Sequence, residues 1–259
     1  MIDRVASLLG AFVGQRPLTL AQIARRSNLP RSSTHRILQR MVELGWIERH
    51  GFEYTLGMVM FELGSQVIRQ KNVQAALPVM NELHGRTGLT VHLSALAGSE
   101  ILHLESSGHW LKSHPRLLVG ARQSAAVSAA GHALLAAMDP IDWPEIAFDH
   151  PPTCYSVRTR SQLDREVRKV VERDGVAIEA QGSVLGMTVV AATVEVDRGL
   201  LALSLSGPTR AVRTDYMVAA LRGAIFDVSH VVAGMPRRRR RSMDISAVII
   251  PALAASMAV

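Results

Sequence analysis

Apolar positions recur every three or four residues through the N-terminal part of the chain, a spacing typical of helices that bury one face. The first stripe consists of Val5, Leu8, Leu9, Phe12 and Val13. A second helix is indicated by Thr19 and Gln22, which stand three positions apart in the pattern of a capping box. After a short break over residues 27–30, Pro30 suits the first turn of a third helix. The pattern predicts three consecutive helices.

The third predicted helix, over residues 31–44, sorts its side chains onto two faces. The apolar face consists of Thr34, Ile37, Leu38, Met41, Val42 and Leu44. The polar face consists of Ser32, Arg36, Gln39, Arg40 and Glu43, with Ser33 and His35 at its flanks. The segment after Trp46 alternates around Gly51 and predicts a small two-stranded wing. This order of elements is that of a winged helix-turn-helix, whose recognition helix enters the major groove of DNA.

The polar face of this helix carries the chemistry that double-stranded DNA requires. Long cations and amides reach phosphates and base edges, and hydroxyl groups at a helix start suit a phosphate. We therefore predict DNA contacts from Arg31, Ser32, Ser33, Thr34, His35, Arg36, Gln39 and Arg40. For any single surface arginine, an ordinary solvated face is the simpler interpretation. The capped helix, the tight turn and the wing together favour DNA binding.

The remainder of the chain mixes helices and strands without an even repeat. Residues 57–87 are mainly helical in pattern, with a boundary or kink at Pro78. Further helices are predicted over residues 128–138, Ser161–Arg173 and 211–233, and alternating strands over residues 90–106, 186–196 and 198–207. The first strand pair turns at Gly98 and Ser99. We therefore expect an α+β fold, with a helical winged module followed by an α+β domain.

The basic charge of the chain is concentrated at its two ends. The 259 residues carry a formal net charge of +7. Residues 1–60 contain eight arginines against four acidic residues, and residues 237–241 are five consecutive arginines. The segment between these ends is nearly neutral, so the charge indicates a polyanion partner at the ends rather than a uniformly basic protein.

The composition favours a cytoplasmic protein without a membrane span. Cys154 is the single cysteine, which excludes an intrachain disulfide and suits a reducing compartment. The sequence contains no run of 18 apolar residues. The apolar stretch after Arg4 is preceded by Asp3 and lacks a clean cleavage site, so we do not interpret it as a signal peptide.

Residues 18–57 resemble the winged helix-turn-helix of the IclR family of bacterial transcriptional regulators. The likeness continues through residues 87–106, through SAAGHALLAAM at 128–138, and through the later strands that end in SLSGP, to about residue 235. It implies a DNA-binding domain (1–56), a helical linker (57–73) and a GAF-like domain with an antiparallel sheet and helices (74–235), which binds an effector and oligomerises. We expect residues 236–259, basic and then apolar, to form a disordered tail.

By this resemblance the effector pocket is bordered by Ala129, Ala130, Glu179, Val189, Ser204 and Ser206. The two serines stand two positions apart, so in a strand they share a face and can both donate hydrogen bonds to a ligand. Small residues at a helix start leave its N–H groups open to an anion. These features favour a small organic acid. The chain departs from the family pattern at His132, at Gln181 and Gly182, and at Thr193.

Other candidate chemistry is weaker. His92 and His103 could share a sheet face, but neither metal-ligand spacing nor a cofactor motif is present, so we predict no metal and no cofactor. The two strand serines do not form a nucleophile elbow, and no catalytic triad is evident. The arginine run at 237–241 could touch DNA or acidic lipid non-specifically, or belong to a plain extension.

The sequence therefore predicts a regulator, not an enzyme, that binds a palindromic DNA operator and senses a small organic acid. A recognition helix reads one half-site, so we expect a homodimer or a dimer of dimers. Two alternatives stay open. The α+β domain could be an enzyme or ligand carrier with an incidental helical front, or the protein could bind DNA without any effector.

Overall fold

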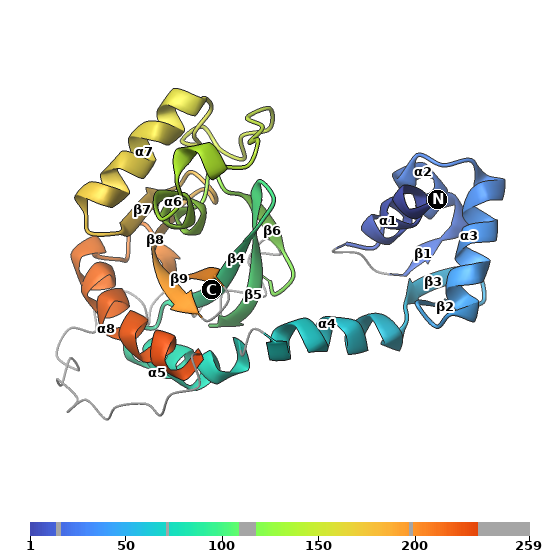
Figure 1. Ribbon diagram of the computed structural model, residues 1–259, viewed down its shortest axis with the longest axis horizontal. Coiled ribbons are helices and arrows are strands. Elements are labelled where there is room, and N and C mark those ends of the chain that lie inside the picture. Colours follow the sequence, from blue (N-terminus) through green and yellow to red (C-terminus); the bar gives the residue numbers. More distant parts are fainter. Residues whose placement is uncertain (14–16, 71–72, 109–117, 197–198, 233–259) are drawn as a thin grey trace. The chain divides into compact units, whose positions relative to one another are not determined.

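The computed structural model describes residues 1–13, 17–70, 73–108, 118–196 and 199–232 (Figure 1). The chain divides into two compact units, Met1–Gln70 and Lys71–Val259. The division falls inside the predicted linker, residues 57–73. The predicted tail at residues 236–259 lies outside the described residues.

The first unit is a winged helical module. It consists of α1 (Ile2–Gly10), β1 (Leu18–Thr19), α2 (Leu20–Ser27), α3 (Arg31–Glu43), β2 (Ile47–His50), β3 (Glu53–Leu56) and α4 (Met58–Gln70). The strands form an antiparallel sheet in the order β1-β3-β2. The three helices and the wing share one core that includes Leu8, Phe12, Ile23, Leu38 and Ile47. This core holds the polar face of α3 outward.

Local signals in the sequence account for the ends of α2. The capping box is confirmed, since Thr19 accepts a hydrogen bond from the backbone N–H of Gln22 and the Gln22 side chain accepts one from Thr19 N–H. Asn28 ends the helix in the left-handed region, at φ 52°. The prediction that two residues lie on buried apolar faces of helices was wrong. Val13 and Leu44 are 67% and 45% exposed, because each follows the last turn of its helix.

The wing and α4 meet at a contact that only glycine allows. A Cβ on Gly57 would lie 2.1 Å from the carbonyl oxygen of Gly45. The Gly57 N–H donates to the carbonyl of Trp46 at 2.8 Å. The start of α4 is therefore fixed to the wing within the first unit.

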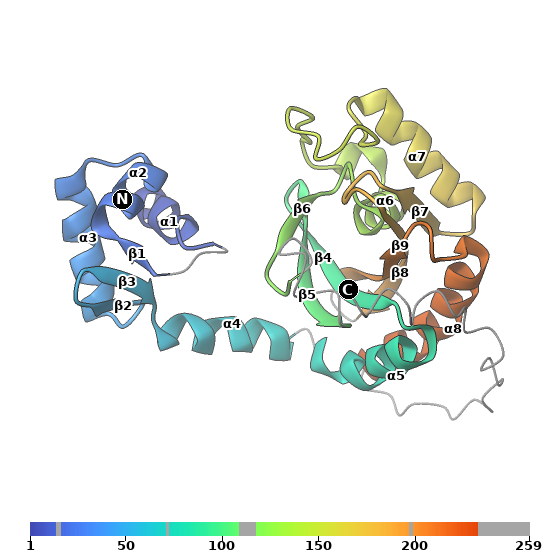
Figure 2. The same ribbon diagram turned by 180° about the vertical axis from the view of Figure 1, so that it is seen from behind.

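The second unit is a six-stranded antiparallel sheet between two layers of helices (Figures 1 and 2). Its helices are η1 (Val73–Ala76), α5 (Leu77–Thr87), α6 (Ala129–Ala136), η4 (Pro140–Asp142), α7 (Arg160–Glu172) and α8 (Thr214–Val232). Its strands are β4 (Thr90–Ala97), β5 (Glu100–Ser107), β6 (Arg122–Ser124), β7 (Val176–Ala180), β8 (Met187–Val196) and β9 (Gly199–Pro208), in the order β6-β5-β4-β9-β8-β7.

Opposite faces of this sheet carry different helices. On one face Ala191 and Ala202 pack in a core with the α6 residues Ala129, Ala130 and Ala133. Because side chains alternate along a strand, the intervening positions of β8 and β9 face the other layer, where α5, η1 and α8 pack. The α+β class and the antiparallel sheet predicted from the sequence are confirmed, and Pro78 lies in the first turn of α5, at a helix boundary.

Candidate DNA interface and effector cavity

Helix α3 presents most of the predicted DNA-binding residues to solvent. The exposed members are Arg31, Ser32, His35, Arg36, Gln39 and Arg40, and Ser33 is half-buried. Pro30 occupies the N-cap position of α3, where it has no side-chain acceptor for the first backbone N–H groups of the helix. The first backbone N–H groups of α3 are thus open to an anion such as phosphate.

The prediction for Thr34 was wrong. Its side chain is fully buried, and its hydroxyl donates to the carbonyl of Pro30 at 3.1 Å. Helical spacing placed Thr34 on the apolar face of α3, and its burial agrees with that placement. The side chain therefore cannot reach a duplex. Thr34 instead ties the first turn of α3 to the preceding break.

The wing adds exposed residues that the sequence-based list omitted. Arg49 and His50 are exposed at the end of β2, and Phe52 is 86% exposed at the turn. Arg49 Nε donates to the carbonyl of Gly51 at 2.9 Å, which orients its guanidinium beside the turn. On α3, Arg40 pairs with Glu43 at 2.8 Å, an exposed pair that a phosphate can displace at little cost. The alternation around Gly51 was the available signal for the wing residues.

A stripe of buried polar side chains crosses the face of the large sheet that α6 covers. Its members are Thr90, His92 and Ser94 on β4, His103 on β5, and Ser204 and Ser206 on β9. In the strand register, Ser206 stands opposite Thr90, Ser204 opposite His92, and His103 opposite Ser94. Each of the six is at most 4% exposed. We call this set the polar stripe.

The polar stripe is only partly satisfied by the protein. His103 Nδ1 lies 2.8 Å from Ser94 Oγ. By contrast, Thr90 Oγ1, His103 Nε2 and Ser206 Oγ are buried with no hydrogen-bond partner among the described residues. Leaving such a group unpaired costs on the order of 1–3 kcal/mol. Packing alone does not explain three of them on one face, so the stripe has the character of a binding surface.

A small cavity lies between the polar stripe and the start of α6. It encloses about 20 Å³, room for roughly one water molecule, and its lining includes His92, His103, Ser128, Ser204 and Ser206. A larger ligand therefore requires the walls to move. The described residues that line this inner cavity include no lysine, arginine, aspartate or glutamate.

Helix α6 directs its N-terminus at this inner cavity. Ser128 caps the helix by accepting a hydrogen bond from Gly131 N–H at 3.1 Å. Ala129 and Ala130, which precede Gly131 in the helix, line the cavity and occupy the turn where backbone N–H groups have no intrahelical acceptor. A Cβ on Gly131 would lie 2.2 Å from the carbonyl oxygen of Ala125, so the helix start is held closely against the preceding segment.

The structure brings five of the six residues predicted for the effector pocket together. Ala129, Ala130, Val189, Ser204 and Ser206 all line the inner cavity. The sequence-based list missed His92, His103, Ser128, Gln123 and Ser183, which line it as well. Alternation on β4 and β5 was the available signal for the two histidines, whose rings lie 4.6 Å apart between centroids.

The sixth residue, Glu179, is not part of the described lining of the inner cavity. Its carboxylate turns back on its own loop, where it accepts hydrogen bonds from Gly182 N–H and, at 2.6 Å, from Ser183 Oγ. Burial raises the pKa of this carboxyl, and these hydrogen bonds oppose the rise. Because Ser183 lines the cavity, Glu179 acts on the site indirectly, by holding this loop.

A second, outer cavity of about 340 Å³ adjoins the inner one. Gln123 and Ser183 line both cavities. The outer cavity lies among the β4–β5 turn, strand β6 and the segment 147–152, and its charged lining includes the ion pair of Arg122 with Glu100, at 3.2 Å. Together the two volumes fall within the range of small-molecule sites.

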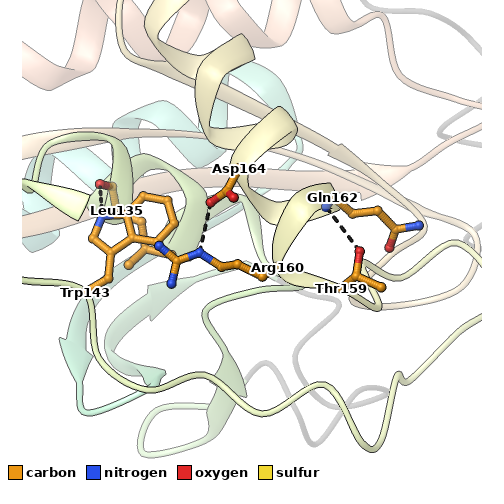
Figure 3. Close-up of polar contacts among 6 residues, drawn as sticks. All are labelled: Leu135, Trp143, Thr159, Arg160, Gln162 and Asp164. Carbon is orange, nitrogen blue, oxygen red and sulfur yellow. Dashed lines mark hydrogen bonds and ion pairs between the residues drawn. The ribbon is translucent and has the colours of Figure 1, made fainter. Parts of the chain in front are cut away.

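The segment that walls the outer cavity is anchored at both ends (Figure 3). Trp143 donates from Nε1 to the carbonyl of Leu135 at 3.0 Å, and the Arg160 guanidinium lies 4.4 Å from the centre of the Trp143 ring. Arg160 is held in turn by Asp164 at 2.9 Å, at the start of α7. The segment between α6 and α7 therefore has a defined path over the sheet edge.

Two buried histidines of the second unit, His103 and His132, are held neutral. Burial, reinforced by His92, lowers the pKa of His103 to about 3. Burial also lowers the pKa of His132, whose Nε2 lies 2.7 Å from the carbonyl of Ala126. No cluster of three or more metal-ligating side chains occurs within the described ranges. None of the helices in the part of the chain that the structure describes is long and apolar enough to cross a membrane.

A winged helix-turn-helix joined to an α+β unit with a polar cavity defines the class of ligand-binding transcription regulators. The comparisons with known proteins agree. Residues 1–51 match the IclR helix-turn-helix domain, and residues 65–230 match the bacterial transcriptional regulator IclR C-terminal domain. The chain belongs to the IclR family, whose members are transcriptional regulators and not enzymes.

Individual relatives cover most of the chain. The HTH-type transcriptional regulator BhcR of Paracoccus denitrificans is 26% identical over 92% of this chain and 88% of its own length. The transcriptional repressor IclR of Escherichia coli is 24% identical over 76% of each chain. A crystal structure of an IclR homolog from Microbacterium hydrocarbonoxydans, complexed with 4-hydroxybenzoate, superposes with a TM-score of 0.75 at 26% identity, over 90% of this chain and 99% of that one.

Proposed function

We propose that this protein is a cytoplasmic regulator that binds a palindromic operator as a homodimer or dimer of dimers, and that a small organic acid in the inner cavity controls the binding. The observation that carries the effector part is the polar stripe beneath the open N-terminus of α6. Backbone N–H groups at a helix start favour a carboxylate, and the stripe offers neutral hydrogen-bonding groups beside it.

The solved relative supports an acid as the ligand class. In that crystal structure the relative is complexed with 4-hydroxybenzoate. For this chain, Ser204 and Ser206 contribute hydroxyl groups to the cavity face, and Ala129 and Ala130 place the start of α6 in the lining, where backbone N–H groups favour an anion. A ligand can switch the regulator only if it binds the DNA-competent and DNA-incompetent states with different affinity.

The effector proposal is tested with the double variant Ser204→Ala, Ser206→Ala. A thermal-shift screen of small organic acids identifies a ligand, since binding to the native state raises the melting temperature. DNA-binding titrations then measure the ligand response. The double variant should lose the response while it retains operator affinity, because the first unit is unchanged. A double variant that responds with wild-type ligand affinity would place the pocket elsewhere.

The dimer proposal is supported by the surface of α4. Met58, Phe61, Leu63 and Val67 are 48–69% exposed along this one helix. Four large apolar side chains exposed within ten residues of one helix are a feature of interaction surfaces. The variant Phe61→Glu should shift the protein towards monomer in analytical ultracentrifugation, whereas Glu62→Lys, on the same helix, should not. A wild-type protein that stays monomeric at micromolar concentration with operator DNA would overturn the dimer.

A further inference from the structure

Two ends of the inner cavity differ in the chemistry that they offer a ligand. At one end are the first residues of α6, Ala129 and Ala130, with backbone N–H groups that favour an anion. Ile101 belongs to the same buried cluster as both alanines and lines the inner cavity with them. Two positions further along β5, on the same face of the sheet, is His103. A ligand that lies against the helix start is therefore within a short span of His103.

One ring nitrogen of His103, Nε2, is buried without a hydrogen-bond partner among the described residues. Its Nδ1 is engaged with Ser94 Oγ at 2.8 Å, and its Nε2 has no partner within the residues that the structure describes. The residue is 4% exposed and lines the inner cavity. Because water does not satisfy Nε2 from outside, the hydrogen bond must come from whatever occupies the cavity.

The charge of His103 limits which ligand group can lie against it. The pKa of about 3 leaves the ring neutral near pH 7. The described lining of the inner cavity offers no lysine or arginine that would balance a second carboxylate, and no acid that would balance an ammonium group. A charged group at His103 would thus be buried without a counter-charge, which is strongly unfavourable.

A hydroxyl group meets the requirements of either tautomer of His103. If Ser94 Oγ–H donates to Nδ1, then Nε2 carries the proton and donates to the ligand oxygen. If Nδ1–H donates to Ser94, then Nε2 accepts the proton of the ligand hydroxyl. An unsubstituted carbon at this place would leave Nε2 unpaired in both cases.

We propose that the effector is a hydroxy acid with a single carboxylate, and that His103 is the residue that selects its hydroxyl group. The proposal rests on the proposed function, in which the inner cavity binds an organic acid. It goes further by dividing the ligand into an anionic end at Ala129 and Ala130 and a neutral hydroxylated end at His103. It predicts discrimination against acids that lack the hydroxyl and against dicarboxylic acids.

The test compares matched pairs of acids on the full-length wild-type protein by isothermal titration calorimetry at pH 7. The pairs are 4-hydroxybenzoate with benzoate, 4-hydroxyphenylacetate with phenylacetate, and 4-hydroxybutyrate with butyrate. Terephthalate and succinate serve as dicarboxylates. At least one hydroxy acid should bind about tenfold or more tightly than its partner, and the dicarboxylates should bind more weakly than either.

The variant His103→Phe keeps a ring of similar size but removes Nε2. The ratio of the two dissociation constants within a pair of acids should therefore fall to about one. His103→Gln, which retains a polar group that can donate and accept, should keep part of the preference. If His103→Phe does not fold, ¹⁵N spectra of histidine-labelled wild-type protein give the answer. The Nε2 resonance of His103 should move when the hydroxy acid is added and stay in place with its partner.

The outcomes separate the two proposals. If no acid in the panel binds, the organic-acid effector is overturned, and the role of His103 falls with it. If acids bind without a preference for the hydroxyl, the role of His103 alone is overturned. The role of His103 is also overturned if His103→Phe keeps the preference for the hydroxy acid, or if the Nε2 resonance does not move when the hydroxy acid is added.

Discussion

The ring of His92 lies beside the ring of His103, with centroids 4.6 Å apart and planes tilted by 35°. The two residues belong to neighbouring strands and are almost fully buried. Protonation of both rings would place two positive charges side by side at buried positions. Burial, and then this repulsion, holds the pKa of His103 at about 3.

The low pKa of His103 predicts a loss of stability in acid. In the unfolded chain this histidine takes up a proton near pH 6.5, whereas in the folded protein it does so near pH 3. Between these values the unfolded state binds more protons, so the stabilising effect is complete above pH 6.5 and is lost as the pH falls towards 3. His132, whose pKa is also lowered, acts in the same direction.

Urea unfolding at several pH values between 7 and 5 checks this prediction. His103→Phe should lose stability less steeply than the wild type, by up to about 1.4 kcal/mol per pH unit for one proton. The comparison concerns the slope with pH, so a change in overall stability caused by the new side chain does not affect it. Parallel slopes for the two proteins would show that His103 titrates normally.

Glu179 predicts a pH dependence of the opposite sign. Its folded-state pKa is raised, so the folded protein binds more protons than the unfolded chain between the two pKa values. The favourable contribution is complete below the unfolded pKa and is lost as the pH rises through the folded one. Glu179→Gln removes this titration. As the pH rises from 4 to 7, the free energy of unfolding of the variant should therefore increase relative to that of the wild type.

Thermal unfolding across that pH range measures the Glu179 effect. Glu195→Gln is a suitable control, because Glu195 is exposed at the end of β8. Its pH profile should follow that of the wild type. If Glu179→Gln and the wild type also have parallel profiles, the Glu179 carboxyl is not perturbed as the burial and the loop contacts require.

Buried Thr34 and exposed Arg36 predict different effects on DNA affinity, although both lie on α3. Arg36→Ala should weaken operator binding by roughly 1–3 kcal/mol if the side chain reads a base. Thr34→Val should leave DNA affinity unchanged and lower stability by about 1 kcal/mol, because it deletes the hydrogen bond to Pro30. Fluorescence anisotropy at fixed salt measures the affinities. Equal losses for the two variants would contradict the assignment of the faces of α3.

Two glycines in helices predict opposite outcomes on substitution by alanine. In Gly131→Ala the new Cβ would lie 2.2 Å from the carbonyl oxygen of Ala125, so backbone must shift and several kcal/mol of stability should be lost. In Gly85→Ala, on α5, the Cβ meets nothing within 4 Å. That variant should gain up to about 1 kcal/mol from helix propensity. Denaturant titration compares them, and a stable Gly131→Ala would refute the close contact.

Local patterns were enough to predict most of the elements. The capping box at Thr19 fixed the start of α2, and the tight turn at Gly98 and Ser99 set the register of β4 with β5 near the turn. Because register and alternation together decide which residues share a face, His92 and His103 could be placed on one face of the sheet from sequence. Short-range rules work where the cause lies within a few residues.

The sequence did not reveal features that depend on distant or irregular contacts. Glu179 was assigned to the pocket, but Gln181 adopts φ 64° and the chain turns so that the carboxylate meets its own loop. The outer cavity is built by segments far apart in the chain, which no periodicity connects. Strand alternation likewise cannot tell which buried hydroxyl finds a partner, so Ser206 and Ser94 look alike in sequence.

The contact between Gly131 and Ala125 has a consequence for engineering the protein as a biosensor. Since there is no space for a methyl group, changes of side chain cannot reposition the start of α6, and the cavity end that we propose binds the carboxylate is fixed. The opposite wall is made of strand side chains that point into the cavity at regular intervals. A small combinatorial library at positions 92, 103 and 204 could therefore change which acids are detected, while the start of α6 stays as it is.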